Sequence, residues 1–237
     1  FSSAAITGTG SFTQAGTGTT TLTAANTYTG TTTVDKGTLS LGTSGSLTAT
    51  TSVTVTNGAT LLLGSSAPNS INANAALNLG GGQLSMGAAG TGGSRASSQT
   101  FNTLTLTANS SIDFANLTGT SSLYFSNING LKDNTLSIFN YNGASSSTGG
   151  VGQFTKLYAA TSSTSGFSAN LGNILFYSGG DISSLLGSAS FGGTVGGYTE
   201  ITDIVPVPEP SVIIAALMLL AWLLYTNRGA MRRLIGC

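Results

Sequence analysis

The side chains that could do acid–base, nucleophilic or metal chemistry are few in this sequence. Residues 1–204 hold six carboxylates and four cations, which are Asp35, Asp113, Asp133, Asp181, Glu200 and Asp203, with Lys36, Arg95, Lys132 and Lys156. The chain has no His, so the commonest general base and metal ligand is missing. Its single Cys is the last residue, Cys237, and no disulfide can form within the chain.

The spacing of these charges does not form a catalytic pattern. Asp35–Lys36 and Lys132–Asp133 are adjacent pairs at predicted turns, where charges are usually solvated. Asp113 alternates with Ile112 and Phe114, which points its carboxylate outward from a predicted strand. No two carboxylates share a strand face at a spacing suited to general acid–base catalysis, and no phosphate loop or calcium ladder occurs. We therefore predict a non-enzymatic protein without metal or cofactor.

Tyrosines in the second half of the chain are the other side chains of chemical interest. Four of them could stack on sugar rings, namely Tyr124, Tyr141, Tyr158 and Tyr177. The same rings could instead form the core and turn cover of a cap on the end of a β-structure. The sequence leaves both interpretations open.

The composition indicates β-structure with many short turns. Charged residues make up 6% of the 237 residues, against roughly a quarter in an ordinary soluble domain. Thr, Ser, Asn and Gly fill the usual places of charges, and 40% hydrophobic residues argue against a disordered chain. Thr suits a pleated surface, and Gly and Asn suit tight turns. The zero net charge argues against nucleic acid as a partner.

A short motif recurs in which Gly, alternating apolar residues and Gly follow one another. Its copies are residues 37–42, 58–64 and 82–87, with a weaker copy at 111–115. The copies end about 22 residues apart, within the range of strand-bearing solenoid repeats. Stacking such coils would bury Leu on Leu and pair each strand with its neighbours. We therefore predict a right-handed parallel β-helix, with an antiparallel β-sandwich as the alternative.

Residues 6–42 contain a more specific pattern. It reads Leu-Thr-x-x-Asn-x-Tyr-x-Gly-x-Thr-x-Val-x-x-Gly-x-Leu-x-Leu-Gly and is matched at Leu22, Asn26, Tyr28, Gly30, Thr32, Val34, Gly37, Leu39, Leu41 and Gly42. This pattern resembles the autotransporter-associated β-strand repeat. The resemblance implies a β-helical passenger stalk on a bacterial surface. The chain leaves no room for the barrel of a self-contained autotransporter, so we expect another export route and a signal peptide upstream of Phe1.

Three apolar residues of the pattern are expected to face the interior, namely Val34, Leu39 and Leu41. Asn26 and Gly30 are expected to adopt left-handed turn geometry, which these two residue types tolerate. Tyr28 is expected to cover a turn. Residues 116–204 lose the repeat and gain aromatic residues, and there we predict a β cap over the open end of the solenoid.

The composition changes abruptly at residue 205. A stiff segment contains Pro208, Glu209 and Pro210, a wholly apolar run spans 212–225, and three arginines follow at Arg228, Arg232 and Arg233. Fourteen residues of helix span only about 21 Å, less than a bilayer core of about 30 Å. The arginines and flanking aromatic rings nevertheless favour a transmembrane helix over about 211–226 with its C-terminus in the cytoplasm.

The Pro-Glu-Pro motif, the apolar run and the terminal arginines resemble the PEP-CTERM sorting signal. The resemblance implies that an exosortase-like membrane protease recognises the motif, with Glu209 as the recognition carboxylate, and releases the protein to the envelope or to an exopolysaccharide matrix. A plain tail anchor with a Pro-rich spacer is the alternative.

Three regions are therefore predicted: a repeat solenoid at 1–115, an aromatic-rich β cap at 116–204 and a sorting signal at 205–237. The predicted protein is exported and non-enzymatic. It passes through a single-pass inner-membrane intermediate and then resides at the cell surface or in the extracellular matrix. The alternative is a carbohydrate-binding adhesin that uses the aromatic residues of 116–204.

Overall fold

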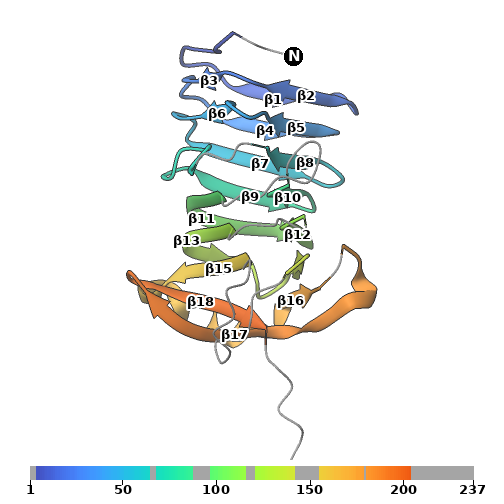
Figure 1. Ribbon diagram of the computed structural model, residues 1–237, viewed down its shortest axis with the longest axis vertical. Helices are drawn as coiled ribbons and strands as arrows, with labels where there is room; N and C mark the ends of the chain where they lie inside the picture. The colour runs from blue at the N-terminus through green and yellow to red at the C-terminus, as the bar shows by residue number, and fades with distance from the viewer. Residues whose placement is uncertain are drawn as a thin grey trace, which may run out of the picture. The chain divides into compact units, whose positions relative to one another are not determined.

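The computed structural model describes residues 4–64, 68–87, 97–115, 121–141, 155–178 and 180–203. The chain divides into two units, Phe1–Ile204 and Val205–Cys237. All described residues lie in the first unit, which is a β-solenoid whose last coil is joined to an antiparallel hairpin (Figure 1).

Two columns of parallel strands form the main faces of the solenoid. Sheet 1 consists of β1 (Phe12–Gln14), β4 (Thr32–Val34), β7 (Ser52–Thr56), β9 (Ala76–Gly80), β11 (Ser97–Ala108), β13 (Ser121–Asn129) and β15 (Thr155–Ala160). Sheet 2 consists of β2 (Thr19–Leu22), β5 (Thr38–Leu41), β8 (Thr60–Leu63), β10 (Gln83–Ser85), β12 (Ser110–Asp113), β14 (Leu136–Phe139) and β16 (Ile174–Tyr177). The chain alternates between the two sheets, one coil after another (Figure 1).

A short third side completes the first coils. β3 (Ala25–Asn26) pairs in parallel with β6 (Ser46–Leu47), and a parallel bridge joins Leu47 to Ile71 in the next coil. Every strand pair within the two columns is also parallel. The parallel solenoid is therefore confirmed over the antiparallel sandwich, while its right-handedness stays a prediction.

Apolar side chains stack in register along the interior. In sheet 2 six consecutive strands place one fully buried residue at the same register position, namely Leu39, Leu61, Leu84, Ile112, Ile138 and Phe176. In sheet 1 the strands β7, β9 and β11 do the same with Val53, Leu77 and Leu104. Burying one such side chain stabilises the fold by about 1.5–3 kcal/mol relative to leaving it exposed. The inward direction predicted for the repeat residues is confirmed, because Val34, Leu39 and Leu41 are all 0% exposed.

Asn26 and Gly30 of the repeat have other roles than the ones predicted. Asn26 does not adopt left-handed geometry. Its buried amide instead accepts a hydrogen bond from Ile6 N (2.9 Å) and donates to Ala24 O (2.8 Å) and Ser46 O (3.1 Å), so it ties neighbouring coils together. Gly30 also lacks a positive φ; an added Cβ there would lie 2.3 Å from the carbonyl oxygen of Gly10. Close stacking of the coils is therefore the reason for glycine at this position.

The interior also takes up Tyr28, which was predicted to cover a turn. Its side chain is 2% exposed, and its hydroxyl forms a 2.6 Å hydrogen bond with Thr32 Oγ1. Thr32 Oγ1 in turn bonds Thr50 Oγ1 at 3.2 Å, and Thr50 donates to Gly30 O at 2.8 Å. Burial raises the pKa of Tyr28, as expected for a phenol held away from water.

The parallel coils end in short helices and an antiparallel hairpin. After β15 come η1 (Thr161–Ser163), α1 (Thr164–Phe167) and η2 (Ser168–Asn173), and after β16 come η3 (Ile182–Ser184), β17 (Leu185–Val195) and β18 (Tyr198–Asp203). β17 pairs with both β16 and β18, and β18 pairs with β15, all antiparallel. The hairpin thereby joins the two columns into one sixteen-stranded sheet at the bottom of Figure 1.

The transmembrane helix in the predicted fold class requires a correction. Across the described ranges, no helix is long and apolar enough to cross a membrane. The longest, η2, has six residues and spans about 12 Å at the rise of a 3-10 helix, against a bilayer core of about 30 Å. Residues 211–226, where the helix was predicted, lie outside the described residues. The structure supports a mainly β fold, which is a β-solenoid with an antiparallel hairpin at its end.

Candidate functional site

The four tyrosines predicted as a sugar platform do not lie together. Tyr124 and Tyr158 occupy the same outward register position on β13 and β15 of sheet 1. Tyr177 packs against Phe139 on sheet 2, with ring centroids 4.9 Å apart. Tyr141 is 1% exposed and lies against Phe176, with centroids 4.3 Å apart. A single platform built from all four rings is therefore wrong.

The tyrosines on sheet 1 form a packed cluster with an ion pair. The rings of Tyr124 and Tyr158 stack 4.8 Å apart and within 5° of parallel, and Tyr198 meets Tyr124 edge-on at 5.2 Å. Lys156 Nζ lies 2.9 Å from Glu200 Oε1. Burial, the Glu200 carboxylate and Tyr124 together raise the pKa of Tyr158 to about 12. Tyr158 is only 6% exposed and offers little ring surface to a ligand, whereas Tyr124 and Tyr198 are half-buried.

The sequence analysis did not identify the contacts of this cluster with β18. It missed both Tyr198 and the Lys156–Glu200 ion pair. β18 runs antiparallel to β15, which places Glu200 opposite Tyr158 and Tyr198 opposite Ala160. The strands β15 and β18 are about forty residues apart in sequence, and the local residue pattern does not predict that β18 runs antiparallel to β15.

Other charged side chains considered in the sequence analysis lie apart on different coils, namely Asp113, Asp181 and the adjacent Lys132 and Asp133. Asp113 Oδ1 accepts hydrogen bonds from Ala115 N and Asn140 Nδ2, both at 2.7 Å, and so braces the turn after β12. Asp181 Oδ1 accepts from Ser183 N at 2.8 Å, and hydrogen bonds from Ser183 lower the pKa of Asp181. Lys132 and Asp133 are exposed. Within the described part of the chain, no group of three or more metal-binding side chains gathers.

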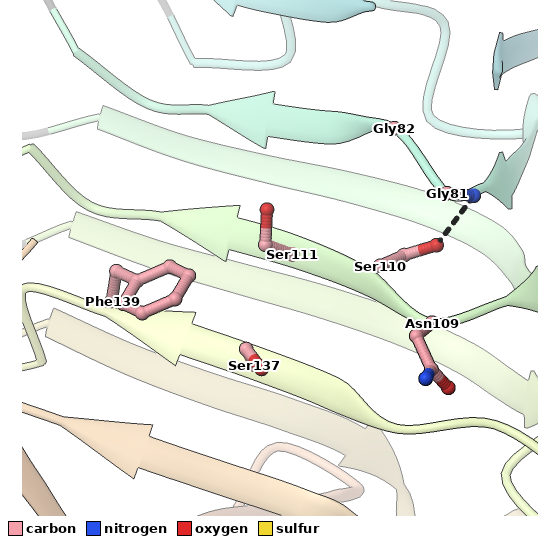
Figure 2. Close-up of a pocket in the computed structure, with 7 residues that line it drawn as sticks. All are labelled: Gly81, Gly82, Asn109, Ser110, Ser111, Ser137 and Phe139. Carbon is pink, nitrogen blue, oxygen red and sulfur yellow. Dashed lines mark hydrogen bonds between the residues drawn. The ribbon is translucent and has the colours of Figure 1, made fainter. Parts of the chain in front are cut away.

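Within the described part of the chain, a shallow recess on the outer side of sheet 2 is a candidate for a ligand site. It has a volume of about 210 Å³ and seven lining residues, which are Gly81, Gly82, Asn109, Ser110, Ser111, Ser137 and Phe139. Figure 2 shows Ser111 and Ser137 on adjacent strands, with the Phe139 ring toward one end and Asn109 toward the other.

The recess forms beside the turn between β9 and β10, because the two residues of that turn are glycines and have no side chains to fill the space. Gly81, with a φ of 88°, and Gly82 connect β9 to β10. A Cβ on Gly82 would lie 2.5 Å from Val55 Cγ1 and 2.7 Å from Thr56 O, so only glycine fits against the preceding coil. The turn is held by Ser110, whose Oγ accepts a hydrogen bond from Gly81 N at 3.0 Å (Figure 2) and donates to Ala108 O at 2.8 Å.

Two hydroxyls at the recess remain available. Ser111 and Ser137 are register partners on β12 and β14, both half-buried, and neither hydroxyl has a hydrogen-bond partner among the described residues. Asn109 Oδ1 accepts from Thr135 N at 2.9 Å, which fixes the amide and leaves its nitrogen free as a donor within the same part of the chain. The sequence reasoning placed Gly82 and Ser111 in repeat copies but did not identify a site there.

Comparison with known proteins gives one match. A family model described as Passenger-associated-transport-repeat matches residues 12–41, which run from β1 through β5. No curated protein and no solved structure matches the chain. The match confirms the predicted repeat and indicates a secreted or surface protein of the passenger type.

The predicted sorting residues lie outside both the matched repeat and the part of the chain that the structure describes. Pro208, Glu209 and Pro210, together with Arg228, Arg232 and Arg233, lie outside the described residues, and the matched repeat ends at residue 41. A sorting signal at 205–237 therefore has the sequence resemblance as its sole support.

Proposed function

We propose that this chain is an exported, non-enzymatic surface or matrix protein whose solenoid serves as a stiff stalk. The observation that carries the proposal is the unbroken succession of paired parallel strands from β1 to β15 and from β2 to β16. Such a column is held by backbone hydrogen bonds and a continuous apolar interior, and it extends by simple repetition. The match to a passenger-type repeat supports the surface location.

The outer surface suits a polysaccharide matrix. One outward register position of sheet 1 carries only neutral hydrogen-bonding side chains on six consecutive strands, namely Thr13, Thr33, Thr54, Asn78, Thr105 and Asn129. These groups exchange hydrogen bonds with water and with sugar hydroxyls and attract no counterions. Exopolysaccharide is accordingly the partner that this surface fits.

The export route belongs to the same proposal and rests on the sequence. Pro208, Glu209 and Pro210 would be the motif that an exosortase-like protease at the inner membrane recognises, with the arginines Arg228, Arg232 and Arg233 behind it. Replacing Glu209 by Gln removes the recognition carboxylate and is expected to leave an uncleaved precursor with the cells. Equal release of the variant and the unchanged chain would contradict this route.

The location itself is tested on intact cells. An epitope tag inserted at the exposed Gly196–Gly197 turn between β17 and β18 should be labelled by antibody and removed by added protease without lysis. Labelling that appears only after lysis would overturn the proposal. Incubation of the purified chain with a polysaccharide panel tests the non-enzymatic part, since release of reducing ends or unsaturated sugars would contradict it.

The adhesin remains a second candidate because one observation favours it. Phe139, an aromatic residue of 116–204, lines the recess on sheet 2 beside two hydroxyls that have no partner in the described part of the chain. A ring next to free hydroxyls is an arrangement that can hold a sugar.

A further inference from the structure

The recess on sheet 2 combines three kinds of group in one small space. Ser111 and Ser137 present hydroxyls that both donate and accept, and Asn109 presents an amide donor. Phe139 adds an apolar ring, which Tyr177 holds in place from the next strand at a centroid distance of 4.9 Å. An aromatic wall beside convergent polar groups is the usual make-up of a small-molecule site.

The lining has no charge, and this restricts the ligand. All seven lining residues are neutral. The carboxylate of Asp113, the register partner of Phe139, is not among them, and its Oδ1 is occupied by Ala115 N and Asn140 Nδ2. Phosphate, sulfate and uronate groups need cationic or amide-rich partners that are absent from this lining. A ligand rich in neutral hydroxyls matches it.

The size of the recess also restricts the ligand. Its volume of about 210 Å³ lies below the roughly 300–1,000 Å³ of pockets that enclose drug-sized molecules. The recess therefore admits one ring and leaves the rest of a longer ligand on the surface. The outward register position of Ser111 and Ser137 continues toward the N-terminal coils with Gln83 and Thr60, and toward the last coil with Leu175. A chain-like ligand could therefore extend along sheet 2.

We propose that this recess binds one sugar unit of a neutral polysaccharide. The sugar hydroxyls would bond Ser111, Ser137 and Asn109, and the apolar face of the ring would lie on Phe139. This inference deepens the proposed matrix role and rests on it for its biological setting. A single sugar in so open a site implies a dissociation constant of about a millimolar, which repeated units along one polymer would strengthen.

The test is affinity electrophoresis of the purified full chain in gels that contain one polysaccharide. Dextran, mannan and starch are the neutral probes, and alginate is the acidic probe. At least one neutral polymer should retard the chain. Replacing both serines by valine (Ser111→Val with Ser137→Val) or Phe139 by Ala should weaken that retardation about tenfold, because polar and stacking contacts are lost.

A matched control lies on the opposite sheet. Thr103→Val with Thr107→Val also removes two outward hydroxyls, both on β11 and neither at the register position assigned to the matrix, and it should leave retardation unchanged. Thermal unfolding of every variant checks that the solenoid is intact. Absence of retardation by all three neutral polymers, equal loss in the sheet 1 control, or retardation by alginate alone would overturn the inference. Because the assay uses purified protein, its outcome is independent of where the chain resides in the cell.

Discussion

The two ends of the solenoid stack the same kind of strand and fill the interior with different side chains. The early coils have strands of two to five residues and an interior mainly of Leu and Val, such as Leu39, Leu61 and Val53, with Tyr28 as a buried ring. The later coils have strands of up to twelve residues and bury rings, with Phe101 stacked on Phe125 at 5.8 Å. The family match covers only early coils. The parallel pairing of strands therefore continues through β15 and β16, although the recognisable repeat ends at residue 41.

The largest expected effect comes from shortening one interior residue in each half. Phe125→Ala should lower the free energy of unfolding by about 4 kcal/mol, and Leu61→Ala by about 3 kcal/mol, since both side chains are fully buried. Urea unfolding followed by circular dichroism measures both. A loss below about 1 kcal/mol for Phe125→Ala would mean that the aromatic half is loosely packed and that the two halves differ in more than composition.

A smaller effect is expected from the amides that bridge coils in each half. Asn26 makes three hydrogen bonds to the backbone in the early coils, and Gln99 accepts from Ile71 N and donates to Ile71 O, both at 3.0 Å, in the later ones. Either side chain replaced by Ala leaves buried backbone groups unpaired and should lower stability by about 2 kcal/mol. Asn102→Ala, at an exposed position of β11, is the control and should have little effect. If only one of the two substitutions lowers stability, side-chain amides do not have the same role in the early and the later coils.

The sequence was sufficient for features that depend on alternation within one strand. The pattern of Val53 and Val55, or of Leu61 and Leu63, predicts which residues are buried. It was insufficient where a residue's role depends on another coil. Asn26 bonds Ile6 and Ser46, each twenty residues away, and local pattern reasoning assigned it to a turn. The recess likewise requires the glycine turn, two later strands and their register, none of which is a local signal.

The hairpin at the end places the Lys156–Glu200 ion pair beside Tyr158, and a pH titration tests its effect. The pKa of Tyr158 is about 12 in the folded chain and near 10 when exposed. Between these values the folded state keeps a proton that the unfolded state has lost, so stability should fall as pH rises from about 10 to about 12. Glu200→Gln removes one of the causes of the shift and should lower the pKa of Tyr158.

Phenolate absorbance measures this pKa when the titration of a Tyr158→Phe variant is subtracted. Asp133→Asn, which removes an exposed carboxylate from a turn, is the control and should leave the titration of Tyr158 unchanged. A Tyr158 pKa that stays at about 12 in Glu200→Gln would show that burial and Tyr124 alone hold the phenol neutral. The ion pair would then contribute to the end of the solenoid only through its own contact.

The smallest expected effect is on the outer face of the early coils. Thr54 points outward from β7 and Val55 points inward. Thr54→Val keeps the branched shape and should change stability by less than about 0.5 kcal/mol. Val55→Thr introduces a side chain of nearly the same shape but buries a hydroxyl in an apolar interior, and it should lower stability by about 1–3 kcal/mol. Denaturant titration of the two variants compares the faces directly. Equal effects would contradict the division between an outer surface that faces solvent and an inner surface that stabilises the fold.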